Sequence, residues 1–338
     1  MTLAGACKNA SKTLLIDSGF VPLLSRLANL GAMILRYHSV QREPGRYAES
    51  IGAGIIHSLA AFEEQIAVVA RYYTPVTLDD ILRFLSSEKQ LPAKAVAVTF
   101  DDGYADNYEV ALPVLARAGV PASFYVTVNA IEAKTPPWYC RVRHAFATTS
   151  KKFWMDSTES ATHDLQGPDL RRSAFLTASR RCAQLVGQLQ ESTLRSIEND
   201  LDVIPLRSAD CPMLTWEQIR GLRRAGHIVG SHTLTHPNLA YLGSDDLQME
   251  LEQSKTRLEA ELHGPVFHFS YPSPILQPHY NGRTVASTKQ AGYRTAVTCT
   301  SGPVRAGHDP LALRRVSAPK ERQEFRWALE CTFLGRSM

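Results

Sequence analysis

The chain has 338 residues, of which 44% are hydrophobic and 21% charged, and its formal net charge is +4. This length suits one large domain or two small ones, and the composition is that of an ordinary globular protein. The charge is too small to indicate a nucleic-acid-binding protein. The six cysteines are scattered and form no CxxC pair, so we expect mostly free thiols in a reducing compartment.

Residues 1–32 are expected to form an N-terminal helical segment. The stretch 13–35 is fairly apolar, but Asp17, Pro22 and Arg26 interrupt it, so no transmembrane helix is indicated. A short amphipathic helix packed on the domain is favoured, and the alternative is a helix in weak peripheral contact with a membrane surface. No basic and apolar leader precedes Cys7, so the expected location is cytoplasmic, free or at the cytoplasmic face of the membrane.

The next part of the chain alternates β-branched, apolar runs with segments of helical periodicity. We predict strands at 33–40, 95–100 and 122–128, and helices at 62–73, after Thr77 and at 108–118. Capping residues support this assignment, because Thr77 precedes two aspartates and Gly119 follows the helix at 108–118. Such alternation is typical of parallel βα units.

The alternation stops between about residues 131 and 212. Four aromatic residues lie there in irregular sequence, and a helical stretch follows near 169–198; the aromatic residues are Trp138, Tyr139, Phe153 and Trp154. We interpret the segment as a mainly helical insertion on the face that carries the functional site. The aromatic side chains either fill a small satellite core, which is their commoner use, or stack on the rings of a ligand.

The pattern resumes after the insertion. Thr215 starts a helix that Gly226 ends, Ser244 caps a long amphipathic helix at 245–262, and another helix is predicted at 283–291. Further strands are predicted at 227–229, 266–271, 293–299 and 311–318. About seven strands alternating with helices indicate an α/β chain folded as a distorted or incomplete (β/α) barrel, and residues 321–338 form a C-terminal helix or tail.

Two carboxylates end the strand predicted at 95–100. Successive side chains on a strand point to opposite faces, so Asp101 and Asp102 can do different work, one holding a metal and one holding a proton. Gly103 lets the backbone turn sharply behind them. The simpler alternative is that these residues form an ordinary turn, for which Asp and Gly are common.

Two histidines follow the strand predicted at 227–229. His232 and His236 can converge on one cation if the segment coils through about one turn, and Pro237 favours a turn over a helix at that point. Two histidines and one aspartate with an open position describe a catalytic zinc site. In barrels, catalytic residues sit at the C-terminal ends of strands, where both motifs are predicted to lie.

These motifs carry a resemblance to a known family. Residues 99–104, Thr-Phe-Asp-Asp-Gly-Tyr, resemble the first motif of the polysaccharide deacetylase family, also called the NodB-homology family or carbohydrate esterase family 4. The segment from Ser231 to His236 resembles its second motif, and residues 270–274 resemble a degenerate third motif. The similarity is to members associated with exopolysaccharides, and it implies a NodB-like catalytic domain at 33–320 that contains the insertion.

The resemblance implies a role for each matching residue. Asp102, His232 and His236 would bind a divalent metal, most simply zinc, Asp101 would be the general base, and a backbone N–H near Tyr104 would hold the oxyanion. The implied reaction removes an N-acetyl group from an amino-sugar-containing saccharide or its precursor. Removal of an O-acetyl group is chemically the same task. The resemblance indicates neither the substrate's length nor the oligomeric state.

The later motifs depart from the family pattern. Ser270 stands where many members have an arginine that orients the catalytic aspartate, and Pro274 replaces a glycine. The Leu-x-His motif that supplies the general acid is absent, and residues 313–316 stand in its place. Similar arginine-bearing tails make Arg315 a further catalytic candidate. The general acid is then one of three histidines: His38, His279 or His308.

These departures leave two alternatives to a deacetylase. One is a saccharide-binding pseudoenzyme that keeps the fold and the metal but has lost turnover. The other is a metal amidohydrolase that acts on a non-sugar amide. The intact aspartate and histidine pairs favour the deacetylase.

Overall fold

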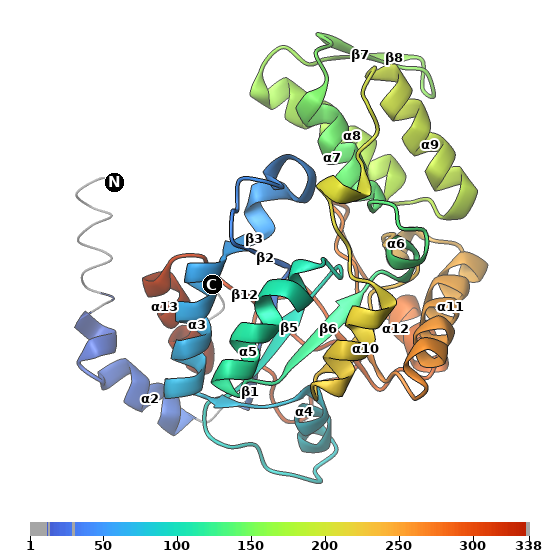
Figure 1. Cartoon of the computed structure of the whole chain (residues 1–338). Coiled ribbons are helices and arrows are strands. Elements are labelled where there is room, and N and C mark those ends of the chain that lie inside the picture. The colour runs from blue at the N-terminus through green and yellow to red at the C-terminus, as the bar shows by residue number, and fades with distance from the viewer. Residues whose placement is uncertain (1–11, 13, 29–30, 336–338) are drawn as a thin grey trace.

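The structure is a computed structural model, and it describes residues 12, 14–28 and 31–335 (Figure 1). Residues 1–11 of the expected N-terminal segment lie outside the described residues, as do 336–338 at the other end. Helix α2 (Phe20–Ala28) belongs to the described part and packs beside helix α13 (Arg322–Phe333). Within the described ranges, no helix is long and apolar enough to cross a membrane.

A curled, parallel sheet forms the centre of the molecule. Seven strands pair in the order β11-β10-β9-β6-β5-β1-β12, and β4 adds to β5. Their bounds are β1 Ala32–Tyr37, β4 Thr74–Pro75, β5 Ala95–Phe100, β6 Ala122–Val126, β9 Ile228–Ser231, β10 His268–Ser270, β11 Thr295–Val297 and β12 Val316–Ser317. The expected α/β fold, a distorted (β/α) barrel of about seven strands, is confirmed.

The segment that leads into β12 connects the two ends of this sheet. Leu313 N–H donates to Ala296 O and Thr298 N–H donates to Leu313 O, both at 2.8 Å, which binds the segment to β11. Three residues later the same chain pairs with β1, where Leu35 lies opposite Val316. The irregular step between these pairings is what distorts the barrel, and it carries Arg315 into the interior.

Helices cover the outside of the sheet. They are α3 Leu59–Tyr72, α4 Leu78–Leu85, α5 Leu112–Ala118, α6 Val128–Glu132, α10 Trp216–Arg224, α11 Ser244–Leu262 and α12 Gly282–Gln290. The short strands β2 (Ser39–Gln41) and β3 (Ile56–Ser58) pair separately. Thr77 and Thr215 cap α4 and α10 as expected, and each forms a capping box. The cap of α11 was wrong by one residue: it is Gly243, because the first helical hydrogen bond already runs from Leu247 N–H to Gly243 O.

Residues 138–200 build a separate layer at one end of the sheet (Figure 1). It consists of α7 Trp138–Thr148, the hairpin β7 Phe153–Asp156 and β8 Ala161–Asp164, α8 Pro168–Cys182 and α9 Gly187–Asp200. The expectation of irregular sequence around Trp138 and Tyr139 was wrong, because both residues belong to α7. Trp154 is fully buried and its ring meets that of Phe146 edge-on at 5.4 Å, so Trp154 fills a satellite core.

Among the residues that the structure describes, no two cysteines form a disulfide. Cys140, Cys182, Cys211 and Cys299 are thiols, in line with the expectation, and Cys7 lies outside the described residues.

Candidate metal and catalytic site

The first half of the site forms where β5 ends. Asp101 N–H continues the sheet by donating to Tyr37 O at 3.1 Å, and the chain then turns at Asp102, whose φ is 75°. Gly103 follows with φ 85°, and a Cβ there would lie 3.2 Å from a side-chain carbon of Val126. Glycine therefore fits this sharp turn against β6 better than any other residue. The turn aims the two adjacent carboxylates in different directions.

The second half of the site is the loop after β9. Thr233 and His236 have φ values of 68° and 63°, so with Asp102 three residues other than glycine adopt left-handed conformations. Such conformations cost free energy and are retained at sites where surrounding contacts hold them. Thr233 Oγ1 accepts from His236 N–H at 2.9 Å, which closes the turn between the histidines. The prediction that both lie on a turn agrees with this geometry.

A buried carboxylate anchors the histidine loop from behind. Glu250 of α11 accepts hydrogen bonds from Leu234 N–H and Thr235 N–H, both at 2.9 Å, and from Thr235 Oγ1 at 2.5 Å. Burial raises the pKa of Glu250, and these three donors oppose the rise. The sequence interpretation missed this residue. Its signal was a glutamate beside Leu251 within the apolar stripe of an amphipathic helix, where an unpartnered charge is costly.

Asp102, His232 and His236 come together as one buried cluster. Asp102 Oδ1 lies 3.5 Å from Nε2 of each histidine, and the candidate ligand atoms all lie within 4.8 Å of one another. Tetrahedral zinc with bonds of about 2.0–2.1 Å separates its ligand atoms by roughly 3.3 Å. The donor set and its spacing therefore fit one small divalent ion.

The surroundings also suit these residues as metal ligands. His232 Nδ1 lies 2.7 Å from Ser270 O, a contact that makes Nδ1 the donor and leaves the Nε2 lone pair toward Asp102. Burial lowers the pKa of His236. Burial raises the pKa of Asp102, but the neighbouring His232 and His236 side chains outweigh it and hold that pKa well below its usual value. The lowered pKa values of His236 and Asp102 both favour the deprotonated forms that metal binding requires.

Asp101 lies beside this cluster, because Ser270, whose carbonyl contacts His232, also binds the Asp101 carboxylate. Arg315 binds it through both terminal nitrogens, with Nη1 at 2.8 Å from Oδ1 and Nη2 at 2.7 Å from Oδ2. Ser270 Oγ donates to the same carboxylate at 3.1 Å. Burial raises the pKa of Asp101, but the Arg315 guanidinium outweighs it, so the carboxyl is ionised at neutral pH. Arg315 thus supplies the guanidinium that the family's arginine would have contributed at position 270.

Tyr104 directly follows the turn that Asp102 and Gly103 make after β5. Its backbone pairs with Met213 through hydrogen bonds made by its neighbours, Ala105 N–H to Pro212 O at 3.0 Å and Leu214 N–H to Gly103 O at 2.9 Å. In such a pair the N–H of the central residue points away from the partner strand. Within the described chain, the Tyr104 N–H has no hydrogen-bond acceptor. It is a free donor two residues from Asp102.

The three histidines considered as general acids occupy different places. His38 lies close enough to Asp102 and Asp101 for their charges to raise its pKa, although burial dominates and lowers it to about 4. Burial also lowers the pKa of His279, with Arg36 and His236 adding to the effect. His308 contacts Arg305 near Val304, which pairs with the first residue of β1. It therefore lies at the opposite end of the barrel from the aspartates and is ruled out as the acid.

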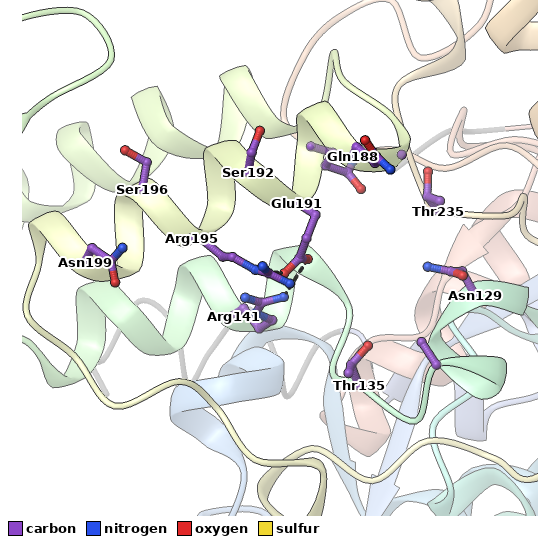
Figure 2. A pocket seen from close by; sticks show the side chains of 13 residues that line it. Asn129, Thr135, Arg141, Gln188, Glu191, Ser192, Arg195, Ser196, Asn199 and Thr235 are labelled. Carbon is purple, nitrogen blue, oxygen red and sulfur yellow. Dashed lines mark hydrogen bonds and ion pairs between the residues drawn. The ribbon is translucent and has the colours of Figure 1, made fainter.

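A cavity of about 970 Å³ lies beside this site, between α9 and the barrel (Figure 2). Asn129, Thr135 and Thr235 line it from the barrel, whereas Gln188 and Asn199 line it from α9. The metal-ligand candidates do not line this cavity. Thr235 nevertheless brings its wall within one residue of His236.

The family model described as polysaccharide deacetylase matches residues 88–296, more than half of the chain. The protein belongs to the polysaccharide deacetylase family. Bacillus subtilis YxkH, a protein named for that family, is 22% identical over 244 residues, which span 72% of this chain. The match covers 58% of the length of YxkH.

Solved structures share the fold. Streptococcus pyogenes deacetylase PplD, determined with acetate, has a TM-score of 0.59 and 19% identity over 89% of this chain and 99% of its own. Ammonifex degensii IcaB has a TM-score of 0.54 and 19% identity, covering 89% of this chain and 97% of its own. A de-N-acetylase from Aggregatibacter actinomycetemcomitans has a TM-score of 0.56 and 15% identity, covering 88% and 99%.

Proposed function

We propose that this protein removes N-acetyl groups from an amino-sugar-containing saccharide or its precursor, with one divalent metal ion bound at the Asp–His–His cluster. The observation that carries the proposal is the meeting of this cluster with an arginine-bound aspartate at one end of the barrel. Family membership supports the same conclusion. An O-acetyl ester would place the same demands on these groups, so it remains within the proposed substrate class.

Asp102, His232 and His236 would hold the ion, for which zinc is the simplest choice given one oxygen and two nitrogen donors. The bound ion would supply Lewis acidity, which activates water and polarises the acetyl carbonyl. The contact of His232 Nδ1 with Ser270 O would keep its ring oriented for this task.

Asp101 would act as the base. Its carboxylate is ionised at neutral pH and would accept the proton that the attacking water loses. Arg315 and Ser270 position this carboxylate rather than touching the reacting atoms. The Tyr104 N–H would donate a hydrogen bond to the carbonyl oxygen as negative charge develops there. His38 and His279 remain the candidates for protonating the leaving amine.

The placement of Arg315 favours an active enzyme over a pseudoenzyme. One reason for considering a pseudoenzyme is the loss of the arginine expected at position 270; the others are Pro274 and the missing Leu-x-His motif. Arg315 reaches the same carboxylate from the segment before β12 with two hydrogen bonds, and its own Nε donates to Thr298 O at 2.9 Å. The aspartate therefore keeps the partner that the chemistry needs.

Acetate release tests this function. The purified protein, loaded with zinc after metal analysis, is expected to release acetate from N-acetylated chito-oligosaccharides and to stop when a chelator removes the metal. Restored activity on adding zinc back would confirm that the metal is the cause. Tight zinc binding without acetate release from N-acetylated or O-acetylated saccharides would instead support the pseudoenzyme.

We further propose that α2 makes peripheral contact with a lipid surface. Its Val21 and Ser25 are buried against the domain, whereas Phe20, Leu23 and Leu27 are 59%, 57% and 72% exposed. Arg26 lies beside them, and cations next to apolar side chains suit an anionic membrane surface.

Replacing these three exposed residues by serine should abolish co-flotation of the protein with anionic phospholipid vesicles. Ile204→Ser removes another highly exposed apolar side chain elsewhere, so it serves as the matched control. Equal flotation of the triple variant and the control would refute the contact.

A further inference from the structure

Another cavity lies at the opposite end of the barrel from the metal site, under helix α2. Its volume is about 560 Å³, within the range of small-molecule sites, roughly 300–1,000 Å³. Its walls come from α2, from the end of α3 and from the residues where β4 and β5 begin. Three lining residues are basic, Arg26, Arg71 and Lys94, and among the described residues none that lines it is acidic.

Two of these cations have no carboxylate partner. In the part of the chain that the structure describes, the exposed side chains of Arg26 and Arg71 make no hydrogen bond and no ion pair. The Arg71 guanidinium lies over the ring of Tyr72, with 5.3 Å from its carbon to the ring centroid. Such stacking uses the face of a guanidinium and leaves its N–H edge free to donate. Both groups are therefore available to an anion.

The third cation is buried and already balanced. Lys94 is 9% exposed, and its Nζ lies 3.0 Å and 3.2 Å from the two carboxylate oxygens of Glu330 in α13. Tyr73 OH donates to the same carboxylate at 2.6 Å, and Ser25 Oγ of α2 also donates to it. These buried contacts fix α2 on the domain. Since Glu330 balances Lys94, the two guanidiniums are the surplus charge of the wall.

An apolar surface adjoins this charge. Leu23 lines the cavity and is exposed, and Phe20 and Leu27 are exposed on the same helix. Tyr72, a residue type common at membrane interfaces, is exposed on the α3 side. A matching ligand carries a negative charge that accepts hydrogen bonds from guanidinium groups and an apolar part next to it. Phospholipids combine these features, because arginine binds phosphate well and acyl chains are apolar.

We infer that this cavity binds the head-group phosphate of an anionic phospholipid, while the exposed apolar side chains of α2 enter the acyl region. The inference rests on the proposed lipid contact of α2 and adds a site of defined chemistry to it. It also sets the orientation of the protein. Lys94 directly precedes β5 and Asp101 directly follows it, and a strand of 6 residues is about 20 Å long. The Asp–His–His cluster therefore faces away from the bilayer, toward saccharide in the aqueous phase.

The double variant Arg26→Gln/Arg71→Gln tests the phosphate site. Both side chains are exposed and make no hydrogen bond, so thermal unfolding should be nearly unchanged. Binding to vesicles of phosphatidylglycerol and phosphatidylcholine should fall roughly 30-fold, because each basic residue near an anionic surface contributes about fivefold.

The matched control is Arg172→Gln/Arg180→Gln, which removes the same charge from exposed side chains of α8 that also make no hydrogen bond or ion pair within the described chain. Helix α8 lies at the far end of the molecule from α2 (Figure 1). Salt screens charges at such separations, so the control should change vesicle binding by less than about twofold.

Titration with dihexanoylphosphatidylglycerol below its micelle concentration separates a built site from diffuse attraction to a surface. The wild-type protein and the control should bind this lipid, and Arg26→Gln/Arg71→Gln should bind it at least about tenfold more weakly. Binding of inorganic phosphate without binding of this lipid would overturn the phospholipid as the ligand.

The vesicle experiment also separates this inference from the proposals on which it builds. Equal flotation of the arginine variant and its control would overturn the phosphate site and leave the α2 contact standing. Absence of flotation by the wild-type protein would refute the contact and the site together. Acetate release is measured without vesicles, so the deacetylase function stands or falls separately.

Discussion

The metal end of the barrel and the cavity under α9 are built in opposite ways. At the metal end the polar groups are buried, strained and bound to one another: Asp102, Thr233 and His236 adopt left-handed conformations, and Arg315 holds Asp101 with two hydrogen bonds. In the cavity, Gln188 and Asn199 are exposed and their side chains make no hydrogen bond to the described chain.

This difference in hydrogen bonding indicates how strongly each region depends on any single residue. Groups that act on the reacting atoms must be fixed before substrate arrives, since catalysis depends on preorganised geometry. Exposed groups on a cavity wall are instead free to pair with whatever enters, and each contributes little alone. Single substitutions should therefore be severe at the metal end and mild in the cavity.

The largest effect is expected for His232→Ala. It removes a ligand and leaves a buried site that no longer closes around the ion, so bound metal should be lost and turnover should fall by more than about 10⁴-fold. Metal content and acetate release measure this together. His263→Asn is the control, because His263 is exposed with φ 51°, a conformation that asparagine tolerates. Full metal occupancy in His232→Ala would sink the ligand assignment.

The next effect separates the two adjacent aspartates. Asp101→Asn keeps the shape but removes the base, so it should retain metal and substrate while turnover falls by about 10²–10⁴-fold. Asp102→Asn should instead weaken metal binding, and excess metal should restore part of its activity. Metal content and rate are measured for both variants side by side. Equal metal loss in the two would refute the divided roles, and a fully active Asp101→Asn would remove the proposed base.

A smaller effect is expected for Arg315→Lys, which keeps the charge but loses the paired contact, and turnover should fall roughly 10–100-fold. Arg315→Met should go further, because it leaves Asp101 buried without a cation and lowers the free energy of unfolding by about 3–5 kcal/mol. In both variants the pKa of Asp101 rises. Since this group works when ionised, the acid limb of kcat/KM should move to higher pH, by roughly 1–3 units in Arg315→Met.

A pH–rate profile beside a thermal unfolding curve checks this prediction. The depressed pKa of Asp101 gives stability that is present above its unfolded pKa of about 3.9 and lost as pH falls through the lower folded pKa. The free energy of unfolding of Arg315→Met should therefore fall furthest below that of the wild-type protein near neutral pH. The difference between the two proteins should shrink in acid. An unchanged acid limb in a folded Arg315→Met protein would show that Arg315 does not control the base.

Local sequence determined the parts of the molecule whose physics is local. The run Ala95–Phe100 is β-branched and apolar, so it forms a buried strand, and Thr77 and Thr215 cap helices through hydrogen bonds that span three residues. The positions of Asp102, His232 and His236 at strand ends followed from the same patterns. Parallel strands of one barrel bring such ends together, which is why the cluster was predictable from the chain alone.

Only the tertiary structure decided which distant groups meet. Arg315 reaches Asp101 because an irregular segment pairs first with β11 and then with β1, and nothing in the residues around position 315 specifies that step. Glu250 anchors the histidine loop, and α9 walls a cavity with Thr235, through contacts between elements far apart in sequence. Such contacts depend on how the packed helices and strands are placed relative to one another, and periodicity within one element cannot encode that placement.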